Sequence, residues 1–332
     1  MSGPHPAVAA VRHAVRESLS GGTGPVLVAC SGGADSLALA AALAFEAPRA
    51  GRPAGLITID HGLQPGSAGQ ADRVAAIGHE LGLAPVQVVR VDAKNGTGGP
   101  EGAARIARYR ALDAAAESDG ATVLLGHTLD DQAETVLLGL GRGSGPRSIA
   151  GMRAVTGHYR RPLLGIRRAT TVAACAALGL AVWDDPHNAD PVYQRVRLRR
   201  EVLPLLEDVL QGGVAEALAR TAAQLQVDLD ALDRAASVHA ASVHSVPDGP
   251  LDVADLGGLD AAVRVRVLRN WLRSGGVPPG ELSSRHLDAI EQLITGWRGQ
   301  GPIDVPGRFA VVRSSGTLVL RTPQRRDPQP KE

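Results

Sequence analysis

The sequence predicts an α/β fold, in which a doubly wound parallel sheet is followed by a helical linker and a small α+β domain. Two patterns predict this order. Up to Leu125, short apolar runs alternate with helix-length segments, and later a long amphipathic helix pattern precedes short helices and strands. The length of 332 residues agrees with about two domains, because single hydrophobic cores rarely grow beyond roughly 250 residues.

Strand-like apolar runs recur in the N-terminal half. They cover Val26–Ala29, Gly55–Ile59, Val86–Val91 and Thr122–Leu125. Helical patterns separate them, at Asp35–Phe45, Gln70–Leu81 and Glu101–Glu117. Such alternation is typical of a parallel sheet covered on both faces, where ligands bind beyond the carboxyl ends of the strands. The polar loops at those ends, residues 30–36, 60–66, 92–100 and 126–132, are therefore the expected site.

Helical patterns dominate the next part of the chain, at Arg167–Leu178, Val192–Leu203 and Val214–Val243. After a polar link at Ser245–Pro250, we expect helices at Ala261–Ser274 and Ser283–Thr295, and strands at Ile303–Val305, Phe309–Arg313 and Thr317–Arg321. We therefore divide the chain into a sheet domain (1–205), a long helical connector (206–245), a small α+β domain (246–322) and a disordered tail rich in proline and charge (323–332).

Composition limits the classes of protein to which the chain can belong. Two cysteines without a Cys-x-x-Cys pair argue against a zinc or iron–sulfur site and favour a reducing, cytoplasmic environment. No segment approaches the roughly 20 apolar residues that cross a bilayer, so no membrane partner is expected. The net charge of +1 hides an asymmetry, with 11 arginines against 3 acidic residues between Gly139 and Arg200. That segment is typical of a polyanion-binding surface, although a solvated, salt-bridged face is an equal alternative on charge alone.

A glycine-rich loop follows the first predicted strand and opens a helix. It reads Ser31-Gly32-Gly33-Ala34-Asp35-Ser36. Glycine lets the backbone approach an anion closely, and the first amides of a helix point toward it. Ser31 and Ser36 add hydroxyl donors, and Asp35 is a carboxylate able to hold a metal ion beside phosphates. An ordinary glycine turn is the alternative, but the loop resembles the SGGxDS pyrophosphate loop of the ATP pyrophosphatases rather than a Walker loop.

A second polar motif, Gly126–Thr135, follows the predicted strand Thr122–Leu125 and also opens a helix. Asp130 and Glu134 are four residues apart, so both carboxylates lie on one helical face, with His127 in the preceding turn. Acidic residues in a first turn can simply cap a helix. Capping does not explain His, Asp, Gln and Glu together after a strand end, so we expect a functional site.

Together the motifs resemble the tRNA(Ile)-lysidine synthetase family of N-type ATP pyrophosphatases. The resemblance runs from about residue 25 to 205 and continues more weakly at Pro306–Arg308. It is carried by Ser31–Ser36, Asp60–Leu63, Glu101–Tyr109, His127–Thr135, Arg161–Leu164 and Asp185–Asp190, followed by Tyr193, Arg195, Arg197 and Arg199. Pyrophosphate loops are widespread, but their conjunction with HxxDDQxET and DPxNxDxxYxRxRxR is far more specific.

The resemblance implies an adenine nucleotide alpha hydrolase-like fold for residues 1–205 and a tRNA-positioning role for residues 246–322. The implied partners are ATP, Mg²⁺, L-lysine and an isoleucine tRNA with a CAU anticodon. In the implied reaction, the oxygen on carbon 2 of the wobble cytidine is adenylated, and the ε-amine of lysine then displaces AMP to form lysidine. Because an ammonium is not a nucleophile, a carboxylate or histidine must accept a proton.

The resemblance also assigns residues to roles. The catalytic residues are Asp35, Arg105, His127, Asp130 and Glu134. The ATP-binding residues are Ala29, Ser31, Gly32, Gly33, Ala34, Asp35, Ser36, Asp60 and His61. Asp35 and Asp130 are the expected Mg²⁺ ligands. We expect His127, Asp130 and Glu134 to bind the lysine ammonium and handle its proton, and Arg105 to offset charge on phosphate or carboxylate, unless it belongs to a surface helix pair.

Arg195, Arg197 and Arg199 are the expected tRNA-binding residues. Their spacing of two distributes them around a helix axis, so not all can face RNA, and pairing of one or two with Asp185 or Asp190 is an equal alternative. The sequence leaves a homodimer open.

Two other functions are weighed. Another tRNA-modifying ATP pyrophosphatase, such as a thiolase, would need catalytic or cluster-binding cysteines, whereas Cys30 is expected within a strand end and Cys175 on an apolar helix face. A non-catalytic RNA-binding protein could retain the fold as a scaffold, but the acidic residues of both motifs are intact.

Overall fold

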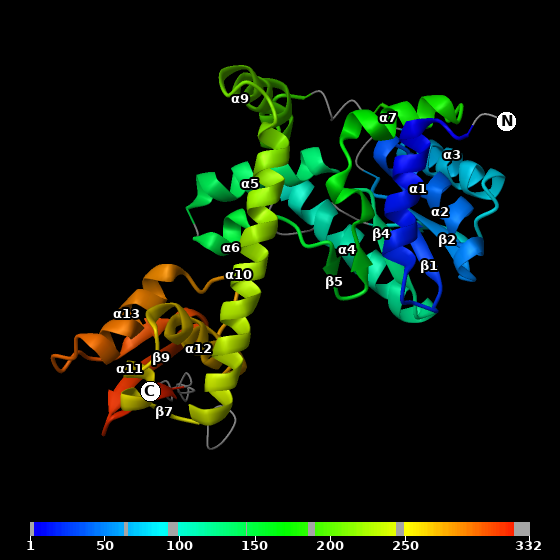
Figure 1. Cartoon of the computed structure of the whole chain (residues 1–332). Coiled ribbons are helices and arrows are strands. Elements are labelled where there is room, and N and C mark those ends of the chain that lie inside the picture. Colours follow the sequence, from blue (N-terminus) through cyan, green and yellow to red (C-terminus); the bar gives the residue numbers. More distant parts are fainter. Residues whose placement is uncertain are drawn as a thin grey trace, which may run out of the picture. The chain divides into compact units, whose positions relative to one another are not determined.

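The computed structural model describes residues 3–62, 66–91, 99–143, 145–184, 190–243 and 249–321 (Figure 1). The chain divides into two compact units. Unit 1 contains Met1–Gly141 and Ile149–Ala222, and unit 2 contains Arg142–Ser148 and Ala223–Glu332. The division falls inside helix α10 (Val214–Val243), whereas the sequence-based boundaries are at residues 205 and 245. The expected tail at 323–332, Leu63, the loop at 92–98, Asp185–Ala189 and most of the link at Ser245–Pro250 lie outside the described residues.

The sheet of unit 1 has the strand order β3-β2-β1-β4-β6-β5. Its strands are β1 (Val26–Ala29), β2 (Ala54–Asp60), β3 (Val86–Arg90), β4 (Thr122–Leu125), β5 (Val155–Thr156) and β6 (Tyr159–Arg160). The pairs from β3 to β6 are parallel, and β5 alone runs antiparallel to its neighbour. The order reverses direction between β1 and β4, and ligands of doubly wound sheets bind at that switch point. The predicted fold class is therefore confirmed.

Helices cover both faces of this sheet. One group packs on the face that carries Val26, Val28, Leu56 and Leu124. It comprises α1 (Pro6–Leu19), α2 (Ala34–Glu46), α3 (Ser67–Glu80) and α7 (Arg168–Ala177). Helix α4 (Gly99–Asp119) packs on the opposite face, against Leu27, Ile57 and Val123. Alternate residues of each strand thus enter two separate cores. Helix α1 was not expected from the sequence.

The remaining helices of unit 1 lie around the site. They are α5 (Leu129–Arg142), α8 (Gln194–Arg197), a π-helical turn η4 (Leu198–Val202), α9 (Leu203–Val209) and the first part of α10. Short 3-10 turns occur at η1 (Pro48–Ala50) and η2 (Pro162–Gly165). The single-turn helix α6 (Pro146–Ile149) spans a boundary between the units in the sequence, with Pro146–Ser148 in unit 2. Leu129 and Ala133 of α5 pack against Leu203 and Ala215, which anchors α5 to α9 and α10.

Unit 2 combines the second part of α10 with a four-stranded antiparallel sheet of order β7-β10-β9-β8. Its elements are β7 (Leu251–Asp252), α11 (Val253–Gly257), α12 (Ala261–Ser274), α13 (Ser284–Thr295), β8 (Ile303–Val305), η5 (Pro306–Arg308), β9 (Phe309–Ser314) and β10 (Thr317–Arg321). Leu251, Leu268 and Ile290 belong to its own hydrophobic core. Strand β7 and helix α11 were not expected, because each is only two to five residues long.

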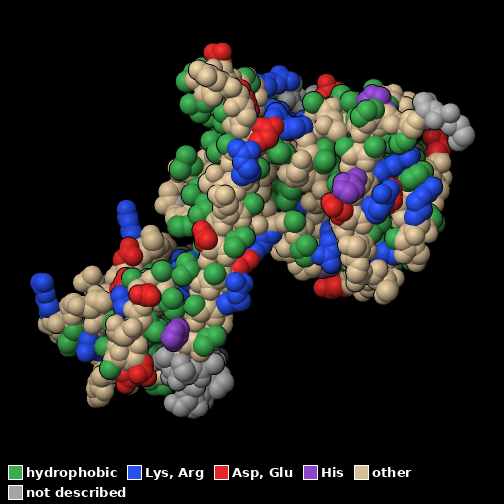
Figure 2. Space-filling model, in the orientation of Figure 1, with side chains coloured by type: hydrophobic (Ala, Val, Ile, Leu, Met, Phe, Trp, Pro, Cys, Tyr) green, Lys and Arg blue, Asp and Glu red, His purple; other side chains and the backbone are tan. Residues whose placement is uncertain are grey.

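Basic and acidic side chains are interspersed on the face of unit 1 that Figure 2 shows. In the described part of the chain, no helix has the length and apolar character needed to cross a bilayer.

Candidate active site

The glycine-rich loop joins the end of β1 to the start of α2. Gly32 has φ +88°, and a Cβ there would lie 2.3 Å from Nε2 of Gln70, so no other residue fits without displacement. The first helical hydrogen bond is donated by the Leu37 amide to the Gly33 carbonyl at 3.0 Å. The amides of Ala34, Asp35 and Ser36 therefore precede the helical ladder, which is the arrangement that binds an anion.

Ser36 braces this loop from inside. Its side chain is buried, and its hydroxyl donates to the Gly33 carbonyl at 2.9 Å and accepts from the Ser31 amide at 3.1 Å. Ser31 is exposed at the mouth of the loop. The Ser36 hydroxyl thus holds the loop in shape, and the Ser31 hydroxyl lies 3.3 Å from it in an exposed residue.

The second motif touches the loop directly. β1 and β4 are neighbours, with Ala29 opposite Leu125, so both chains leave the sheet at the same edge. A Cβ on Gly126 would lie 3.2 Å from the backbone of Asp35 and Ser36, which shows that the turn after β4 packs on the first turn of α2. The two motifs, nearly a hundred residues apart in the sequence, therefore form one site.

Four carboxylates and four guanidinium groups meet at this edge of the sheet, and we call them the ion network. Its members are Asp35, Asp130, Asp131, Glu134, Arg167, Arg168, Arg195 and Arg199. Within this set the formal charges are equal in number, and Arg167 pairs in addition with Glu216 at 2.6 Å. Such pairing is the condition under which ionised groups tolerate partial burial.

Arg168 connects the two motifs. Its Nε lies 3.3 Å from Oδ2 of Asp35, and its Nη2 lies 2.6 Å from Oδ1 of Asp131. Its Nη1 lies 3.5 Å from Oε1 of Glu134, and its backbone amide donates to Oδ2 of Asp130 at 2.7 Å. Close contact with one carboxylate and longer contacts with two others mean that this guanidinium holds the cluster together from its centre.

Burial and pairing act in opposite directions on the two central carboxylates. Burial raises the pKa of Asp35 above its ordinary value, although Thr171, which donates its hydroxyl to Oδ1, and Arg168 both lower it. Burial also opposes ionisation of Asp131, but the charge of Arg168 and two hydrogen bonds from Thr128 hold the pKa of Asp131 below its ordinary value. Asp131, in the first turn of α5, is therefore ionised and accepts the backbone amide of Thr128, the residue before the helix.

Glu134 is the most enclosed member of the network, with its side chain 0% exposed. Arg199 contacts its two oxygens at 2.8 and 3.3 Å, and Arg168 and Arg195 lie at 3.5 and 3.7 Å. Three guanidinium groups thus surround one carboxylate, and the charge of Glu134 is used in ion pairs with them.

His127 lies in the turn between β4 and α5. Its Nδ1 is buried and has no hydrogen-bond partner among the described residues. Burial lowers the pKa of His127 to about 4, Asp131 opposes the shift, and the charges of Arg161, Arg108 and Arg105 add to it. The imidazole is therefore neutral at physiological pH.

Asp60 and His61 lie at the end of β2, on the other side of β1 from the second motif. Asp60 is 7% exposed and accepts the Gly62 amide at 3.1 Å. A hydrogen bond from Ser67 is the main cause that lowers the pKa of Asp60. The Asp60 carboxylate thus fixes the turn that follows β2.

Two of the three arginines that were expected to bind tRNA point their side chains toward the carboxylates of the ion network. Arg195 and Arg199 are four residues apart and contact Glu134, whereas Arg197 faces outward and pairs with Glu201 at 3.0 Å. The expectation that not all three face RNA agrees with this geometry, but the partners are Asp131 and Glu134 rather than Asp190. Arg199 lies in the π-helical turn η4, and π turns often occur at functional sites.

A pocket of about 130 Å³ opens beside the network. Both charged and apolar residues line it. Its lining is Asp130, Glu134, Arg167, Arg168, Arg199, Leu203, Pro204, Glu207 and Ala215. Such a mixture suits a small zwitterion with an aliphatic stem.

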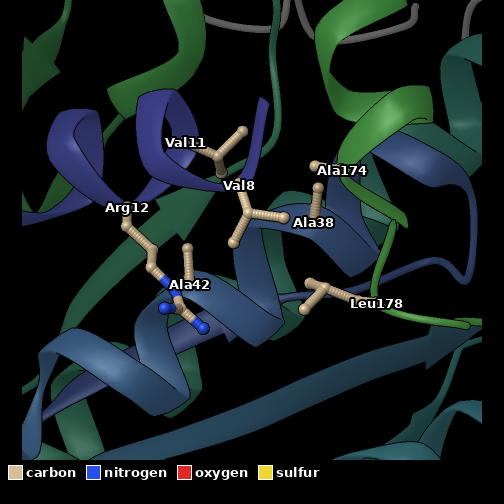
Figure 3. A pocket seen from close by; sticks show the side chains of 7 residues that line it. All are labelled: Val8, Val11, Arg12, Ala38, Ala42, Ala174 and Leu178. Atoms are coloured by element: carbon tan, nitrogen blue, oxygen red, sulfur yellow. The ribbon is translucent and has the colours of Figure 1, made fainter. Parts of the chain in front are cut away.

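A second gap lies between α1, α2 and α7 (Figure 3). Val8, Val11, Ala38, Ala42, Ala174 and Leu178 line it together with Arg12, and it has no room for a water molecule. It is a packing gap between helices.

Sequence reasoning did not single out Arg168 or Thr171, which lie on α7, far from both motifs in the sequence. The nearest signal in the sequence is Arg161–Leu164, which resembles the family and precedes α7. Arg105, in turn, is exposed and lies 5.0 Å from the Tyr109 ring centroid.

Mg²⁺ is compatible with these residues when it is shared with substrate. No group of three or more His, Cys, Asp and Glu side chains in the described ranges is arranged to hold a metal ion. Mg²⁺ commonly binds through one or two carboxylates together with substrate phosphates, and Asp35 offers such a carboxylate beside the loop. Cys30 and Cys175 are both buried and unbridged.

Comparison with known proteins identifies the class first. Residues 8–206 match a PP-loop domain, and residues 251–319 match the TilS substrate binding domain. The chain is also similar to proteins named tRNA(Ile)-lysidine synthase. That of Salinispora arenicola is 57% identical, over 96% of this chain and 97% of its own length, and that of Streptomyces coelicolor is 53% identical, over 96% and 99%. The chain belongs to the tRNA(Ile)-lysidine synthase family of PP-loop proteins, as predicted.

A solved structure supports the fold independently. The U34-tRNA thiolase NcsA from Methanococcus maripaludis, with its 4Fe-4S cluster, has a TM-score of 0.55 at 20% identity. The similarity covers 66% of this chain and 79% of that one. At this identity the likeness concerns the fold alone.

Proposed function

We propose that this protein uses ATP to ligate L-lysine to carbon 2 of the wobble cytidine in a CAU-anticodon isoleucine tRNA, releasing AMP and pyrophosphate. The relatives that cover nearly the whole chain carry the name of that activity. The observation that carries the chemistry is the contact between the two motifs through Arg168, which joins a phosphate-binding loop to a carboxylate cluster.

The phosphate half of the reaction takes place at the loop between β1 and α2. Amides of Ala34, Asp35 and Ser36 receive the phosphates of ATP, and Ser31 adds a hydroxyl. The oxygen on carbon 2 of cytidine attacks the α-phosphorus, the bond to the β-phosphate oxygen breaks, and pyrophosphate leaves. Fixed amide dipoles stabilise the negative charge that develops on the phosphates. Asp60 and His61 remain the proposed contacts on the adenosine side.

The lysine half takes place at the 130 Å³ pocket. Arg167 and Arg199 line this pocket and would exchange part of their contacts with Glu216 and Glu134 for the lysine carboxylate. Leu203 and Pro204 would contact the aliphatic stem of lysine, and Asp130 an ammonium. The ε-amine attacks carbon 2 of the adenylated cytidine, and AMP leaves with the former carbon 2 oxygen.

Asp130 is the proposed acceptor of the amine proton. It is 18% exposed, and its partners are Arg167 at 3.1 Å and a backbone amide. Glu134 shares the predicted lysine role, but its enclosure by three guanidinium groups favours a positioning role. Neutral His127, whose Nδ1 has no partner in the described part of the chain, supplies a hydrogen-bonding group rather than a charge.

Mg²⁺, when bound, would neutralise charge on the phosphates. Asp35 is the carboxylate proposed to hold it, because it borders the loop and lies 23% exposed. Asp130 is the second ligand expected from the sequence, and its contacts with Arg167 and Arg168 compete with that role. A cytoplasmic location and a homodimer remain predictions.

Product analysis tests the reaction. The protein is incubated with ATP, lysine and a CAU-anticodon isoleucine tRNA, and nucleotides are separated by chromatography. We expect AMP and pyrophosphate in equal amounts, dependent on the tRNA. No turnover would contradict the proposal and favour a non-catalytic RNA-binding protein. ADP and phosphate would contradict it in favour of a different ATP-consuming activity.

Lysine kinetics test the pocket. Asp130→Asn should raise the KM for lysine by about tenfold or more, since one charge-assisted contact of an ammonium is lost. Glu201→Gln, at an exposed carboxylate that pairs with Arg197, is the matched control. An unchanged lysine dependence in Asp130→Asn would remove the assignment of Asp130.

A further inference from the structure

Helix α12 carries four arginines in two different environments. Arg266, Arg269 and Arg273 are spaced by three and four residues, so they lie along one face of the helix. Arg264 is 8% exposed and pairs with Glu291 at 2.7 Å. Arg264 is therefore a structural ion pair, and the other three arginines need a separate explanation.

Arg147 adds a fourth guanidinium to this face. It pairs with Asp233 of α10, and Nε of Arg266 lies 3.1 Å from the same carboxylate oxygen. Within the described residues, no carboxylate lies at ion-pair distance from Arg269 or Arg273. We call Arg147, Arg266, Arg269 and Arg273 the arginine stripe. All of it belongs to unit 2, and it sets four positive charges against one carboxylate.

The stripe carries uncompensated charge. Burial lowers the pKa of the Arg269 guanidinium, and the charges of Arg147, Arg266 and Arg273 lower it further, against the opposing effect of Asp233. Like charges on neighbouring helical turns destabilise a helix rather than support it. A bound anion would offset this repulsion.

We propose that the arginine stripe binds phosphates of the tRNA backbone. This rests on the proposed function, which makes tRNA the substrate, and it assigns a face of unit 2 to that contact. Guanidinium groups bind phosphate oxygens in a fork, which lysine cannot do. Arg266 and Arg273 are seven residues apart, a rise of about 10 Å along the helix, so the stripe is long enough for more than one phosphate of a strand.

The ion network strengthens the case for a second basic surface. Arg195 and Arg199, from the most basic part of the sequence, are held by carboxylates in unit 1. Their charge is already neutralised. The stripe, in contrast, keeps a net positive charge, and a polyanion selects such a surface.

Paired double variants of the full chain test the proposal. Arg269→Gln/Arg273→Gln removes two charges from the stripe. Arg285→Gln/Arg298→Gln removes two charges from exposed positions of unit 2 on α13 and the turn after it, and is the matched control. Binding of the CAU-anticodon tRNA is measured by fluorescence anisotropy over a series of KCl concentrations, and lysidine formation is measured on the same preparations.

The stripe variant should bind tRNA about tenfold more weakly, or more weakly still, and its slope of log K against log salt should be smaller by about 1 to 2. The slope falls because a protein with fewer phosphate contacts releases fewer counterions on binding. The control should match wild type. If Arg269→Gln impairs folding, Arg273→Gln alone, at an exposed position, should still reduce the slope by about 1.

Equal affinities and slopes in the stripe variant and the control would overturn the proposal. Lysidine formation by wild type separates the two claims. With lysidine formed and the two slopes equal, the stripe fails and the reaction stands. With a tRNA-binding defect confined to the stripe variant and no lysidine from wild type, the stripe stands and the proposed reaction fails.

Discussion

The ion network of unit 1 and the arginine stripe of unit 2 use the same groups in different ratios. The network combines four guanidinium groups with four carboxylates, and one of the carboxylates is 0% exposed. The stripe has four guanidinium groups, and Asp233 is the carboxylate at ion-pair distance from them among the residues that the structure describes. A balanced cluster fixes side chains in place, which a reaction centre requires. A cluster with excess positive charge produces an electrostatic field that extends into the solvent, and this field attracts a polyanion.

The balanced network should be the more costly of the two to break. Glu134→Gln leaves Arg168, Arg195 and Arg199 without their shared buried charge, and should destabilise the protein by about 3 to 5 kcal/mol and abolish lysidine formation. Urea unfolding followed by circular dichroism measures the first effect. Glu201→Gln, the exposed control, should leave unfolding unchanged. A small cost for Glu134→Gln would show that the network is not a positioning device.

Coupling within the network should also be strong. Arg168→Gln and Asp131→Asn remove the two sides of the 2.6 Å contact. Their combined cost should fall short of the sum of the single costs by about 2 kcal/mol, as expected for directly contacting groups. Unfolding of the two single variants and the double variant gives this number. Additive costs would mean that Arg168 does not act through Asp131.

Acid should weaken unit 1 through His127. Its pKa of about 4 in the folded protein lies below the ordinary 6.5, so the unfolded state binds more protons between these values and stability falls as pH falls from 6.5 to 4. After allowance for partial exposure, the loss is about 2 kcal/mol. Between pH 6.5 and 4, the free energy of unfolding of His127→Asn should fall by about 2 kcal/mol less than that of the wild-type protein. The charge of His127 also lowers the pKa of Asp131, so the difference between the two curves reports the His127–Asp131 pair.

The stripe should respond to removal of its carboxylate in the opposite sense. Asp233→Asn leaves the four arginines fully uncompensated, and should tighten tRNA binding about threefold and steepen its salt dependence. Anisotropy titrations over a KCl series measure both. Weaker binding would show that Asp233 is needed to hold Arg147 and Arg266 in position.

Much of the fold follows from local sequence patterns. The runs Val26–Ala29 and Thr122–Leu125 form strands with the predicted bounds, and Val214–Val243 forms the predicted long helix. Helix α1 escaped prediction, although Pro6 at its first turn and the apolar residues at Val8, Val11 and Val15 are typical of an amphipathic helix.

The sequence could predict only those parts of the site whose residues lie close together in the sequence. Ser31–Ser36 and His127–Thr135 each carry a local motif, and a parallel sheet brings strand ends together. Arg168 lies 133 residues from Asp35, so no spacing pattern could reveal their contact. The directions of Arg195 and Arg199 depend on the carboxylates that α5 presents to them, which is a tertiary property.

Mass spectrometry of the tRNA tests the central claim, that one edge of the sheet unites ATP chemistry with lysine transfer. The CAU-anticodon isoleucine tRNA is incubated with ATP, lysine and the protein, digested to nucleosides and analysed. We predict that the wobble cytidine is converted to lysidine by the wild-type protein and remains unmodified with Asp35→Asn. Unmodified cytidine after reaction with the wild-type protein, or equal conversion by Asp35→Asn, would contradict the claim.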